Sequence, residues 1–488
     1  METLSALDAT FLELEEADEG AHMHIGAVLL LRPPGEEALP SIDVVRAAIA
    51  ARLPMLPLYS RRLSSPRTGG LHWPEWEPDP DFDLTRHVRT ARLPADAGEA
   101  ELCEWAGEYF SIRLDRRHPL WELVVLELDD GRWALVSKTH HCLVDGVGSV
   151  DAAKVLLDSE PHPAAAAPAP ATTPREREDV GTEPGRGLLR RLPAAPLAAG
   201  ARVLRAGAGG LELGARAIDR TLDPHAVRSA LGQSRAAAEL IVRDELSGAP
   251  RTSINGPIGA SRRLAVVPLE LDDLRHVRRE LGGTVNDVVL AIASGALRRL
   301  LIERGETPPE QGLRAMVPVN IRPAAERLAL GNQITSLFVG LPVGIEDRLV
   351  RYRAQIDEAE GLKASNQARG SRGLIDLAAL APPVLHSLLA RSLFATRLFN
   401  VTITNVPGPP TSLFALGSEV EEIWPIVPLA ADHAIGIAAL SYRERLFLCL
   451  NVDRDSVPDA DLLADAIADE AGHLIAISTG PVADRVTS

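Results

Sequence analysis

The sequence predicts an α/β protein built from two halves of similar class. With 488 residues the chain is too long for one ordinary hydrophobic core, so two domains of roughly 200 residues each are expected. Apolar, β-branched runs of strand length alternate with amphipathic segments of helix length along much of the chain. The composition changes abruptly at Ser159, which places the boundary between the halves.

The first half, residues 1–158, is predicted to mix strands and helices. Residues 27–31 form a candidate buried strand. Ser41 is expected to cap a helix whose apolar face carries Val44, Val45, Ala48 and Ile49. The other expected elements are a helix at 101–110, a hairpin of strands 121–128 and 133–139 around an Asp-Asp-Gly turn, and a helix at 149–157.

Residues 159–187 are rich in proline and alanine and then in charge. Such a segment cannot bury enough apolar surface to offset the entropy of ordering, so it is expected to be a mobile linker. Residues 187–220 follow, rich in arginine and poor in acids. Two interpretations stay open for this basic stretch: surface helices that pack on the core, or an interfacial patch that contacts anionic lipid.

The second half, within residues 188–488, is predicted to be α/β again. Residues 345–398 should be largely helical, with breaks at Gly370 and at Pro382-Pro383. The remaining expected elements are helices at 271–281, 284–304 and 459–477 and strands at 313–319, 336–341, 401–404, 435–440 and 446–452.

Composition narrows the classes of partner. The net charge of −16 argues against nucleic acid, which is bound mainly through Lys and Arg. The three cysteines, Cys103, Cys142 and Cys449, are distant from one another and indicate neither a disulfide framework nor a metal site. No secretory signal and no apolar run long enough to span a bilayer are visible. A cytoplasmic protein with small-molecule or protein partners is expected.

The candidate chemistry lies where the predicted strand WALVSKTH runs into the sequence HHCLVDG, residues 140–146. Acyl transfer from a thioester to an alcohol requires the hydroxyl to lose its proton as it attacks. A neutral imidazole is well suited to accept that proton near pH 7, which makes His141 the candidate general base. No nucleophilic serine or cysteine is needed if both substrates bind together, because proximity then promotes the direct attack.

The rest of the motif is expected to support His141. Neighbours on a strand point to opposite faces, so His140 and His141 are poorly placed to share a metal ion, and a core role for His140 remains open. Asp145 could hold the loop by pairing with an arginine, for which Arg322 is the candidate. Gly146 permits backbone angles that a β-carbon would forbid.

The pattern HHxxxDG resembles the signature of the CoA-dependent acyltransferase superfamily, which includes chloramphenicol acetyltransferase and peptide-synthetase condensation domains. Nearly the whole chain resembles one branch, the bacterial wax ester synthase/diacylglycerol acyltransferases. The segments that carry this resemblance, in chain order, are LSALDATFLELE, MHIGAVLLL, PLWE before the motif strand, NGPIG, TVND, VPVNIR, GNQ and TNVPGP.

This resemblance implies two chloramphenicol-acetyltransferase-like subdomains with mixed sheets and an active-site tunnel at their interface. It makes His141 the catalytic base, with His140, Asp145 and Gly146 completing the motif. The implied substrates are acyl-CoA and either diacylglycerol or a long-chain alcohol, which would give triacylglycerol or a wax ester. It implies no further cofactor and no metal. Peripheral association with a membrane or lipid droplet is expected from the basic stretch.

Other polar residues allow competing interpretations. Asn286 and Asp287 recur in the family near the active site, but Thr284-Val285-Asn286-Asp287 also has the spacing of a helix capping box. Candidate donors to the tetrahedral oxyanion are Asn286, Asn405 and backbone N–H groups near Gly146. The scattered histidines show no spacing that demands chemistry and are interpreted as structural; they include His22, His24, His118 and His433.

Two other functions remain as alternatives. One is a different HHxxxDG acyltransferase, of the condensation-domain or polyketide-associated type. Against it, the chain has GIAAL at 436–440, where a segment like DFGWG would be expected, and shows no carrier-protein domain. The other is a non-catalytic protein that binds lipid or lipid droplets, against which the intact His141 and Asp145 argue.

Overall fold

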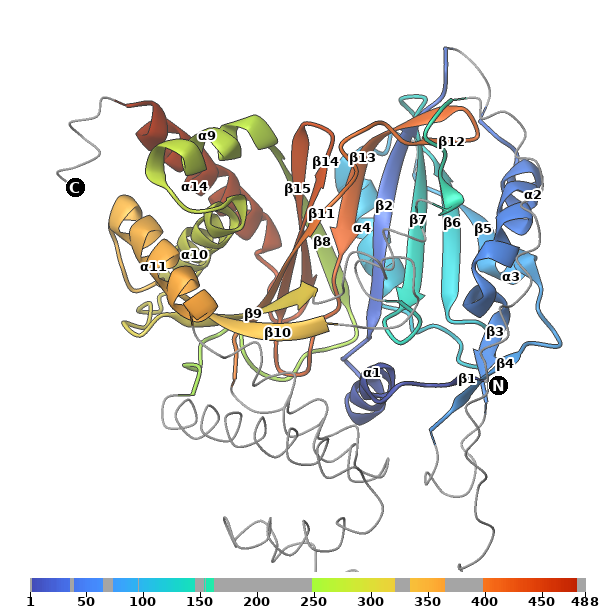
Figure 1. The fold of residues 1–488 in the computed structure, drawn as a ribbon, viewed down its shortest axis with the longest axis horizontal. Helices are drawn as coiled ribbons and strands as arrows, with labels where there is room; N and C mark the ends of the chain where they lie inside the picture. The colour runs from blue at the N-terminus through green and yellow to red at the C-terminus, as the bar shows by residue number, and fades with distance from the viewer. Residues whose placement is uncertain are drawn as a thin grey trace, which may run out of the picture. The chain divides into compact units, whose positions relative to one another are not determined.

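The computed structural model describes residues 2–35, 39–64, 73–94, 96–144, 153, 155–161, 248–320, 334–364 and 398–480. Within these residues the chain forms two six-stranded mixed sheets and a small sheet of three short strands (Figure 1). The predicted α/β class is confirmed. Almost all of the predicted linker at 159–187 and the whole basic stretch that follows it lie outside the described residues.

The first sheet carries the HHxxxDG motif at the end of a central strand. That strand, β7, pairs antiparallel with β6 through the predicted Asp-Asp-Gly hairpin and antiparallel with β2 on its other side. In order across the sheet, the strands are β12 (Phe414–Ala415), β13 (Ser418–Ile426), β2 (His24–Arg32), β7 (Trp133–His140), β6 (Trp121–Glu127) and β5 (Val88–Arg92).

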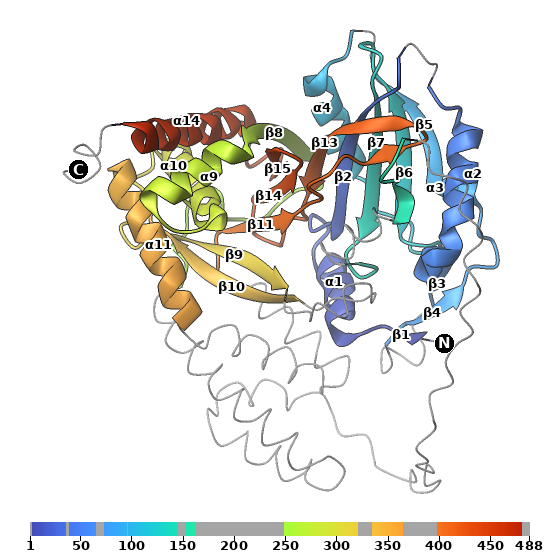
Figure 2. The same ribbon diagram turned by 45° about the horizontal axis from the view of Figure 1, so that its top comes forward.

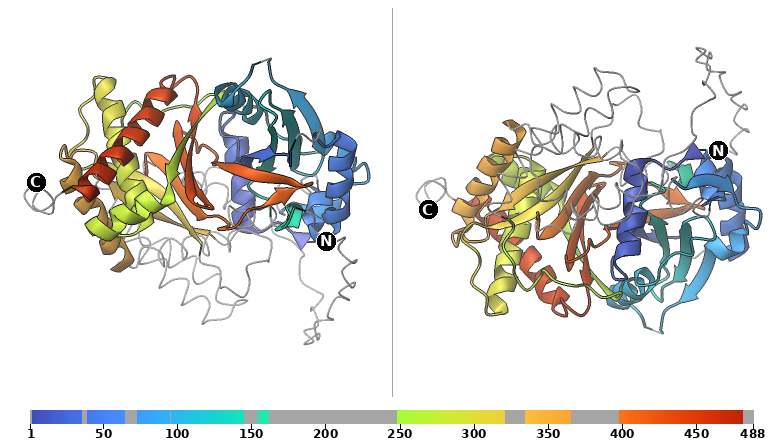
Figure 3. Two further views of the ribbon diagram at one scale, coloured as in Figure 1. Left: turned by 90° about the horizontal axis from the view of Figure 1, so that it is seen from above. Right: turned by 90° about the horizontal axis from the view of Figure 1, so that it is seen from below.

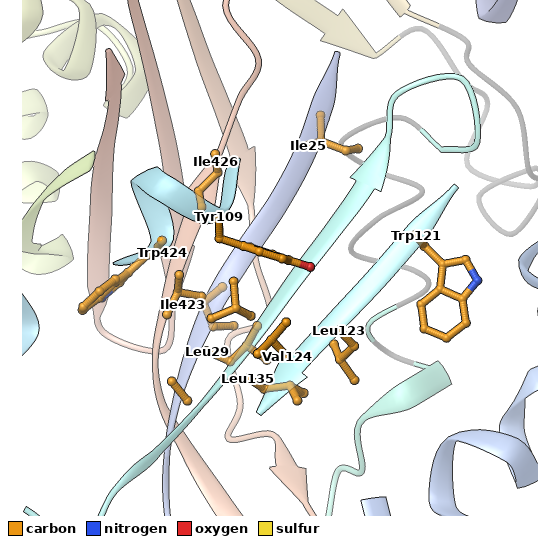
Figure 4. Packing of buried hydrophobic residues seen from close by; sticks show 14 of the residues in the cluster. Ile25, Leu29, Tyr109, Trp121, Leu123, Val124, Leu135, Ile423, Trp424 and Ile426 are labelled. Carbon is orange, nitrogen blue, oxygen red and sulfur yellow. The ribbon is translucent and has the colours of Figure 1, made fainter. Parts of the chain in front are cut away.

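Strand β13 belongs to the second half of the sequence but completes the sheet of the first half (Figure 2). It pairs antiparallel with β2, so that Ile423 lies opposite Leu29, which in turn lies opposite Leu135 of β7. Directly opposed residues share one face of a sheet, and these three side chains form a buried apolar row (Figure 4). The predicted domain boundaries remain a prediction, but the first sheet includes a strand from the second half of the chain.

The second sheet is formed by the second half alone. Its four long helices lie together on one side of the sheet (Figures 1 and 3). The strands in order are β10 (Ile334–Leu341), β9 (Leu313–Asn320), β11 (Val401–Pro407), β14 (Ile435–Tyr442), β15 (Arg445–Asp453) and β8 (Arg262–Glu270). The helices are α9 (Leu271–Leu281), α10 (Val285–Glu303), α11 (Arg348–Ala364) and α14 (Ala460–Thr479).

Short elements surround the first sheet. The three-stranded sheet has the order β1 (Glu2–Thr3), β4 (Glu75–Pro78) and β3 (Arg61–Leu63). The helices are α1 (Ala6–Ala17), α2 (Ile42–Arg52), the 3₁₀ turns η1 (Leu53–Met55) and η2 (Pro57–Ser60), α3 (Leu84–His87) and α4 (Glu99–Phe110). No helix in the described part of the chain is long and apolar enough to cross a membrane.

The structure differs from two local predictions for helix α2. Val45 and Ile49 are buried as expected, but Val44 is 50% exposed. Val45 and Ile49 are four residues apart and share one face of the helix, whereas Val44, one residue earlier, is turned away from that face. Ser41 is the N-cap residue, yet its side chain makes no capping hydrogen bond. Strands β8 and β13 and helix α1 were not among the predicted elements.

Helix α4 joins the first sheet to the second. The buried ammonium group of Lys138 on β7 donates hydrogen bonds to the carbonyls of Tyr109 (3.1 Å) and Ile112 (3.0 Å) at the C-terminal end of α4. Burial lowers the pKa of Lys138 to about 8, against the opposing effect of Glu122. The same helix packs on β8, where a β-carbon at Gly107 would lie 2.7 Å from the carbonyl oxygen of Arg262.

The turn between α1 and β2 is also held by the second half. The guanidinium group of Arg262, almost fully buried, donates hydrogen bonds to the carbonyl oxygens of Gly20 and Gly259 and lies 3.7 Å from Asp453. Burial lowers the pKa of Arg262 to about 10, and the carboxylate of Asp453 opposes this effect. A β-carbon at Gly20 would lie 2.3 Å from the carbonyl oxygen of Ile258, so only glycine fits this turn.

We predict that Gly107→Ala destabilises the protein, because the added methyl group must push apart α4 and the backbone of β8. Overpacking of this kind typically costs about 1–3 kcal/mol of unfolding free energy, measurable by urea denaturation. Gly472→Ala is the matched control, since Gly472 is exposed on α14 and its β-carbon would meet nothing. The control should gain roughly 0.5–1 kcal/mol from lower backbone entropy. Equal effects of both changes would contradict this account.

Candidate active site

The two histidines of the motif lie at the point where β7 ends. His140 is the last residue of β7 and lies opposite His24 of β2, with its ring centroid 6.1 Å from that of His24. His141 begins the turn that follows. The side chain of His140 is fully buried, whereas that of His141 is half-buried. The neighbouring histidines therefore occupy different environments.

The contacts of His140 define its proton position. The backbone N–H of Cys142 donates a hydrogen bond to Nδ1 of His140 (3.1 Å), so Nδ1 carries the lone pair and the neutral ring holds its proton on Nε2. Nε2 lies 3.5 Å from a carboxylate oxygen of Glu15 on helix α1. Burial lowers the pKa of His140, although the contact with Glu15 opposes this shift. His140 is thus a neutral core residue near pH 7.

Glu15 is the centre of a buried polar cluster. Its side chain is 2% exposed, and its oxygen Oε2 accepts hydrogen bonds from Nη2 (2.6 Å) and Nε (3.2 Å) of Arg116. Its other oxygen, Oε1, lies 3.5 Å from Nε2 of His24. Burial alone would raise the pKa of Glu15, but His140, His24 and Arg116 outweigh it and hold the pKa far below its usual value. The carboxylate is therefore ionised.

His141 is held by its backbone and by its ring. Its N–H donates a hydrogen bond to the carbonyl of Met23 (2.8 Å), the residue just before β2. The ring of Phe11, on helix α1, stacks on its imidazole with centroids 3.9 Å apart and an interplanar angle of 16°. A half-buried imidazole with one face covered can present its edge to a substrate, which is the arrangement that a general base needs.

Helix α1 supplies both the Phe11 ring that stacks on His141 and the Glu15 carboxylate beside His140. Ser5 caps its first turn: its hydroxyl accepts a hydrogen bond from the N–H of Asp8 (3.1 Å) and contacts the Asp8 carboxylate (2.5 Å). Phe11 and Glu15 are four residues apart and therefore lie on one face of the helix. That face meets the motif turn.

A second polar group lies at the N-terminus of α10. Thr284 and Asp287 form the predicted capping box: the Asp287 carboxylate accepts hydrogen bonds from the N–H and hydroxyl of Thr284 (both 2.8 Å), and Thr284 accepts from the N–H of Asp287 (3.3 Å). Asp287 is buried, and its Oδ2 accepts both of these hydrogen bonds. The structural interpretation of Asp287 accounts for every contact described.

Asn286, between these residues, meets the other candidate oxyanion donor. The side-chain NH₂ of Asn405 donates a hydrogen bond to the side-chain oxygen Oδ1 of Asn286 (3.3 Å). Asn405 lies on β11 beyond Thr402, where pairing with β9 has ended while pairing with β14 continues. The bond uses the oxygen of Asn286, so the NH₂ group of that amide points elsewhere. Which group stabilises an oxyanion stays a prediction.

Three predicted site residues, Asp145, Gly146 and Arg322, lie outside the described residues. Of the histidines interpreted as structural, His22 contacts the backbone carbonyls of Glu19 and Phe110, and His433 contacts those of Ala431 and Phe399. Nowhere in the described ranges do three or more His, Cys, Asp or Glu side chains gather as metal ligands.

Sequence reasoning missed Phe11, Glu15 and Arg116. The signal for the first two was present: an acid on the apolar face of the helix LDATFLELEE, four residues after an aromatic side chain. What they contact depends on the pairing of β2 with β7, which brings distant segments together. Local periodicity does not report such pairing.

Comparisons with known proteins agree with the motif. A family model for the wax ester synthase/diacylglycerol acyltransferase catalytic domain matches residues 4–289, and a model for the C-terminal domain of the same family matches residues 330–474. This chain belongs to that family. It is therefore an acyltransferase. A probable diacylglycerol O-acyltransferase of Mycobacterium tuberculosis and a putative one of Mycobacterium bovis are each 32% identical to it, over 98% of this chain and 96% of the relative.

Solved structures support the fold of this wax ester synthase/diacylglycerol acyltransferase family member. The wax ester synthase/diacylglycerol acyltransferase from Marinobacter aquaeolei VT8 is 25% identical, with a TM-score of 0.66 over 98% of this chain and all of that chain. A starter condensation domain of rhizomide synthetase has a TM-score of 0.60 at 14% identity, over 98% and 94% of the chains. The chloramphenicol-acetyltransferase-like fold is confirmed.

If the capping box is the whole role of Asp287, Thr284→Ala and Asp287→Ala should each lower the free energy of unfolding by about 1 kcal/mol. The double variant should lose clearly less than the sum, because the two side chains bond each other. Urea denaturation of the four proteins measures this coupling. Strict additivity would contradict the capping box, and a loss of turnover with Asp287→Ala that Thr284→Ala does not share would assign Asp287 a part in the reaction.

Proposed function

We propose that this protein transfers a long-chain acyl group from acyl-CoA to the hydroxyl of diacylglycerol or of a long-chain alcohol, forming triacylglycerol or a wax ester. His141 is the general base in a ternary complex of enzyme, thioester and alcohol. Acyl-CoA and the alcohol approach His141 by opposite mouths of a tunnel between the halves.

One observation carries the proposal. His141, within an intact HHxxxDG sequence, is the half-buried member of the histidine pair, and its ring is stacked on Phe11. His140, in contrast, is enclosed in the core next to an ionised carboxylate. Support also comes from relatives named diacylglycerol O-acyltransferases that match 98% of the chain.

The chemistry needs no cofactor, because CoA enters as part of a substrate. His141 accepts the hydroxyl proton while the alcohol oxygen attacks the thioester carbonyl. The C–S bond then breaks, the ester forms, and the CoA thiolate takes the proton back from the imidazolium. Asp145 and Gly146 shape the turn that follows His141, with Arg322 as the partner of Asp145. Asn286 is the candidate donor to the oxyanion.

With palmitoyl-CoA as donor, we expect CoA release only when diacylglycerol or hexadecanol is added, in equal amount to the ester formed. His141→Ala should lower kcat by about 10²–10⁴-fold, since it removes the general base. A thiol assay for CoA and chromatography of the lipid products provide the measurements. Ester formation from a carrier-protein-bound donor but not from palmitoyl-CoA would favour a condensation-type enzyme.

His433→Ala is a suitable control for the loss of a histidine. Its ring contacts only backbone carbonyls of the second half and stacks on Phe399. This change should affect stability more than the chemical step. Turnover like that of the wild type in His141→Ala would refute the base assignment.

We also propose that the protein associates peripherally with a membrane or lipid droplet. The reason is the arginine-rich composition of residues 187–220 in a chain whose net charge is −16. Cationic, weakly amphipathic segments bind anionic lipid surfaces through charge and a shallow apolar face.

Deleting residues 187–220 should reduce co-sedimentation with phosphatidylglycerol-containing liposomes, and the difference should shrink at high salt. Deleting residues 163–186 is the control, because it shortens the chain without removing this basic stretch. Unchanged sedimentation after the first deletion would rule out the proposal.

A further inference from the structure

One helix contacts both histidines of the motif. Phe11 stacks on the ring of His141, and Glu15, one turn later on α1, faces Nε2 of His140 at 3.5 Å. The two contacts differ in kind: the first is apolar and covers a ring face, whereas the second is electrostatic and buried. A helix that only covered the core would need neither the stack on His141 nor a buried carboxylate beside His140.

Glu15 also reaches the backbone that holds His141. Its oxygen Oε1 accepts a hydrogen bond from the N–H of Met23 (3.4 Å), and the carbonyl of Met23 accepts the hydrogen bond from the N–H of His141 (2.8 Å). The carboxylate therefore lies at two positions around the motif: beside the ring of His140 and at the peptide that fixes the backbone of His141. Both contacts depend on where its two oxygens lie.

Arg116 fixes that position. Two of its nitrogens bond Oε2 of Glu15, a third bonds the neighbouring acid Glu16 at 2.7 Å, and Nη2 also donates to the carbonyl of Leu12 (3.2 Å). The planar guanidinium group thus forms hydrogen bonds with three residues of α1. Planar, multiply bonded arginines hold carboxylates in one geometry better than a single charged contact does.

We propose that Glu15 and Phe11 are positioning residues for the general base: α1 orients the His141 imidazole through the Phe11 stack and, through Glu15, the ring of His140 and the Met23 peptide. Their proposed role acts through the two histidines and requires no contact with substrate. This inference rests on the proposed role of His141 and adds the group that sets its geometry. Small errors in the placement of a catalytic group lower the rate of the chemical step more than they weaken substrate binding.

Glu15→Gln tests the electrostatic part. Glutamine keeps the shape but has one acceptor oxygen, so it can accept from Arg116 or from Met23 but not from both, and it removes the charge that faces His140. We expect kcat to fall about 10- to 100-fold, with KM for palmitoyl-CoA and for the alcohol changed less than about twofold. Circular dichroism at the assay temperature verifies that each variant is folded.

Glu16→Gln is the matched control. Glu16 lies on the same helix and bonds the same arginine, so the change removes an identical charge from Arg116. Its side chain is 59% exposed and pairs with Arg116, not with the motif histidines. We expect kcat within about twofold of the wild type. An equal loss in both variants would mean that only the Arg116 pairing matters, and would overturn the proposal.

Phe11→Leu tests the stack. Leucine keeps an apolar side chain but offers no flat face to the imidazole, so kcat should fall several-fold with KM unchanged. Phe11→Tyr keeps the ring and should restore most of the activity. A Phe11→Leu enzyme with wild-type kcat, or one in which Tyr gives no rescue, would contradict the positioning role of this ring.

A double-variant cycle separates positioning through His140 from other effects. If Glu15 acts through His140, then Glu15→Gln should cause little further loss of kcat in a His140→Gln background. Losses that multiply would overturn that part of the inference. His141→Ala distinguishes the two levels: if it stays active, the proposed function fails, whereas if it is inactive while Glu15→Gln and Phe11→Leu turn over normally, only the present inference fails.

Discussion

The pairing of β13 with β2 is the constraint on which the remaining structure depends. It inserts a strand from the second half of the chain into the sheet of the first half, next to the strand that fixes the motif strand β7. The apolar row of Ile423, Leu29 and Leu135 is buried across three neighbouring strands of this sheet. Each fully buried aliphatic side chain contributes roughly 1.5–3 kcal/mol, so the joined sheet forms a rigid base for the motif turn.

Electrostatics at the motif follows from burial. Glu15 is ionised in the core because His140, His24 and Arg116 together outweigh the effect of burial on its pKa. Arg116 also bonds the carboxylate directly, and removal of one member of such a buried pair typically costs about 3–5 kcal/mol. The neutral form of His140 suits its fully enclosed position, because Nδ1 accepts a hydrogen bond from the N–H of Cys142 and burial lowers the pKa of the ring. His141 lies one residue further, at the edge of this cluster. Glu15 and His140 are held in the core by their contacts, whereas the half-buried ring of His141 is the one that can meet a substrate.

Local patterns predicted what local physics determines. The hairpin around Asp129-Asp130-Gly131, the capping box of Thr284 and Asp287 and the mixed α/β class follow from turn residues, cap spacing and periodicity. The predicted apolar face of α2 was wrong at Val44, which is exposed. In a short helix, a face rotated by one residue fits the spacing of apolar residues almost equally well. The pairing of β13 with β2 and the contacts of Glu15 could not be predicted from the sequence, because both bring together segments that are far apart along the chain. The roles of Asp145, Gly146 and Arg322 stay predictions.

The contact of Arg262 with Gly20 bears on biosynthesis. The turn that leads from α1 into β2 is held by an arginine that is translated some 240 residues later, and that arginine is itself set against Asp453. During translation, the turn after α1 cannot form its contact with Arg262 until that arginine has left the ribosome, and the contact of Arg262 with Asp453 forms later still. A nascent chain therefore acquires its working geometry late, nearly at the moment of release.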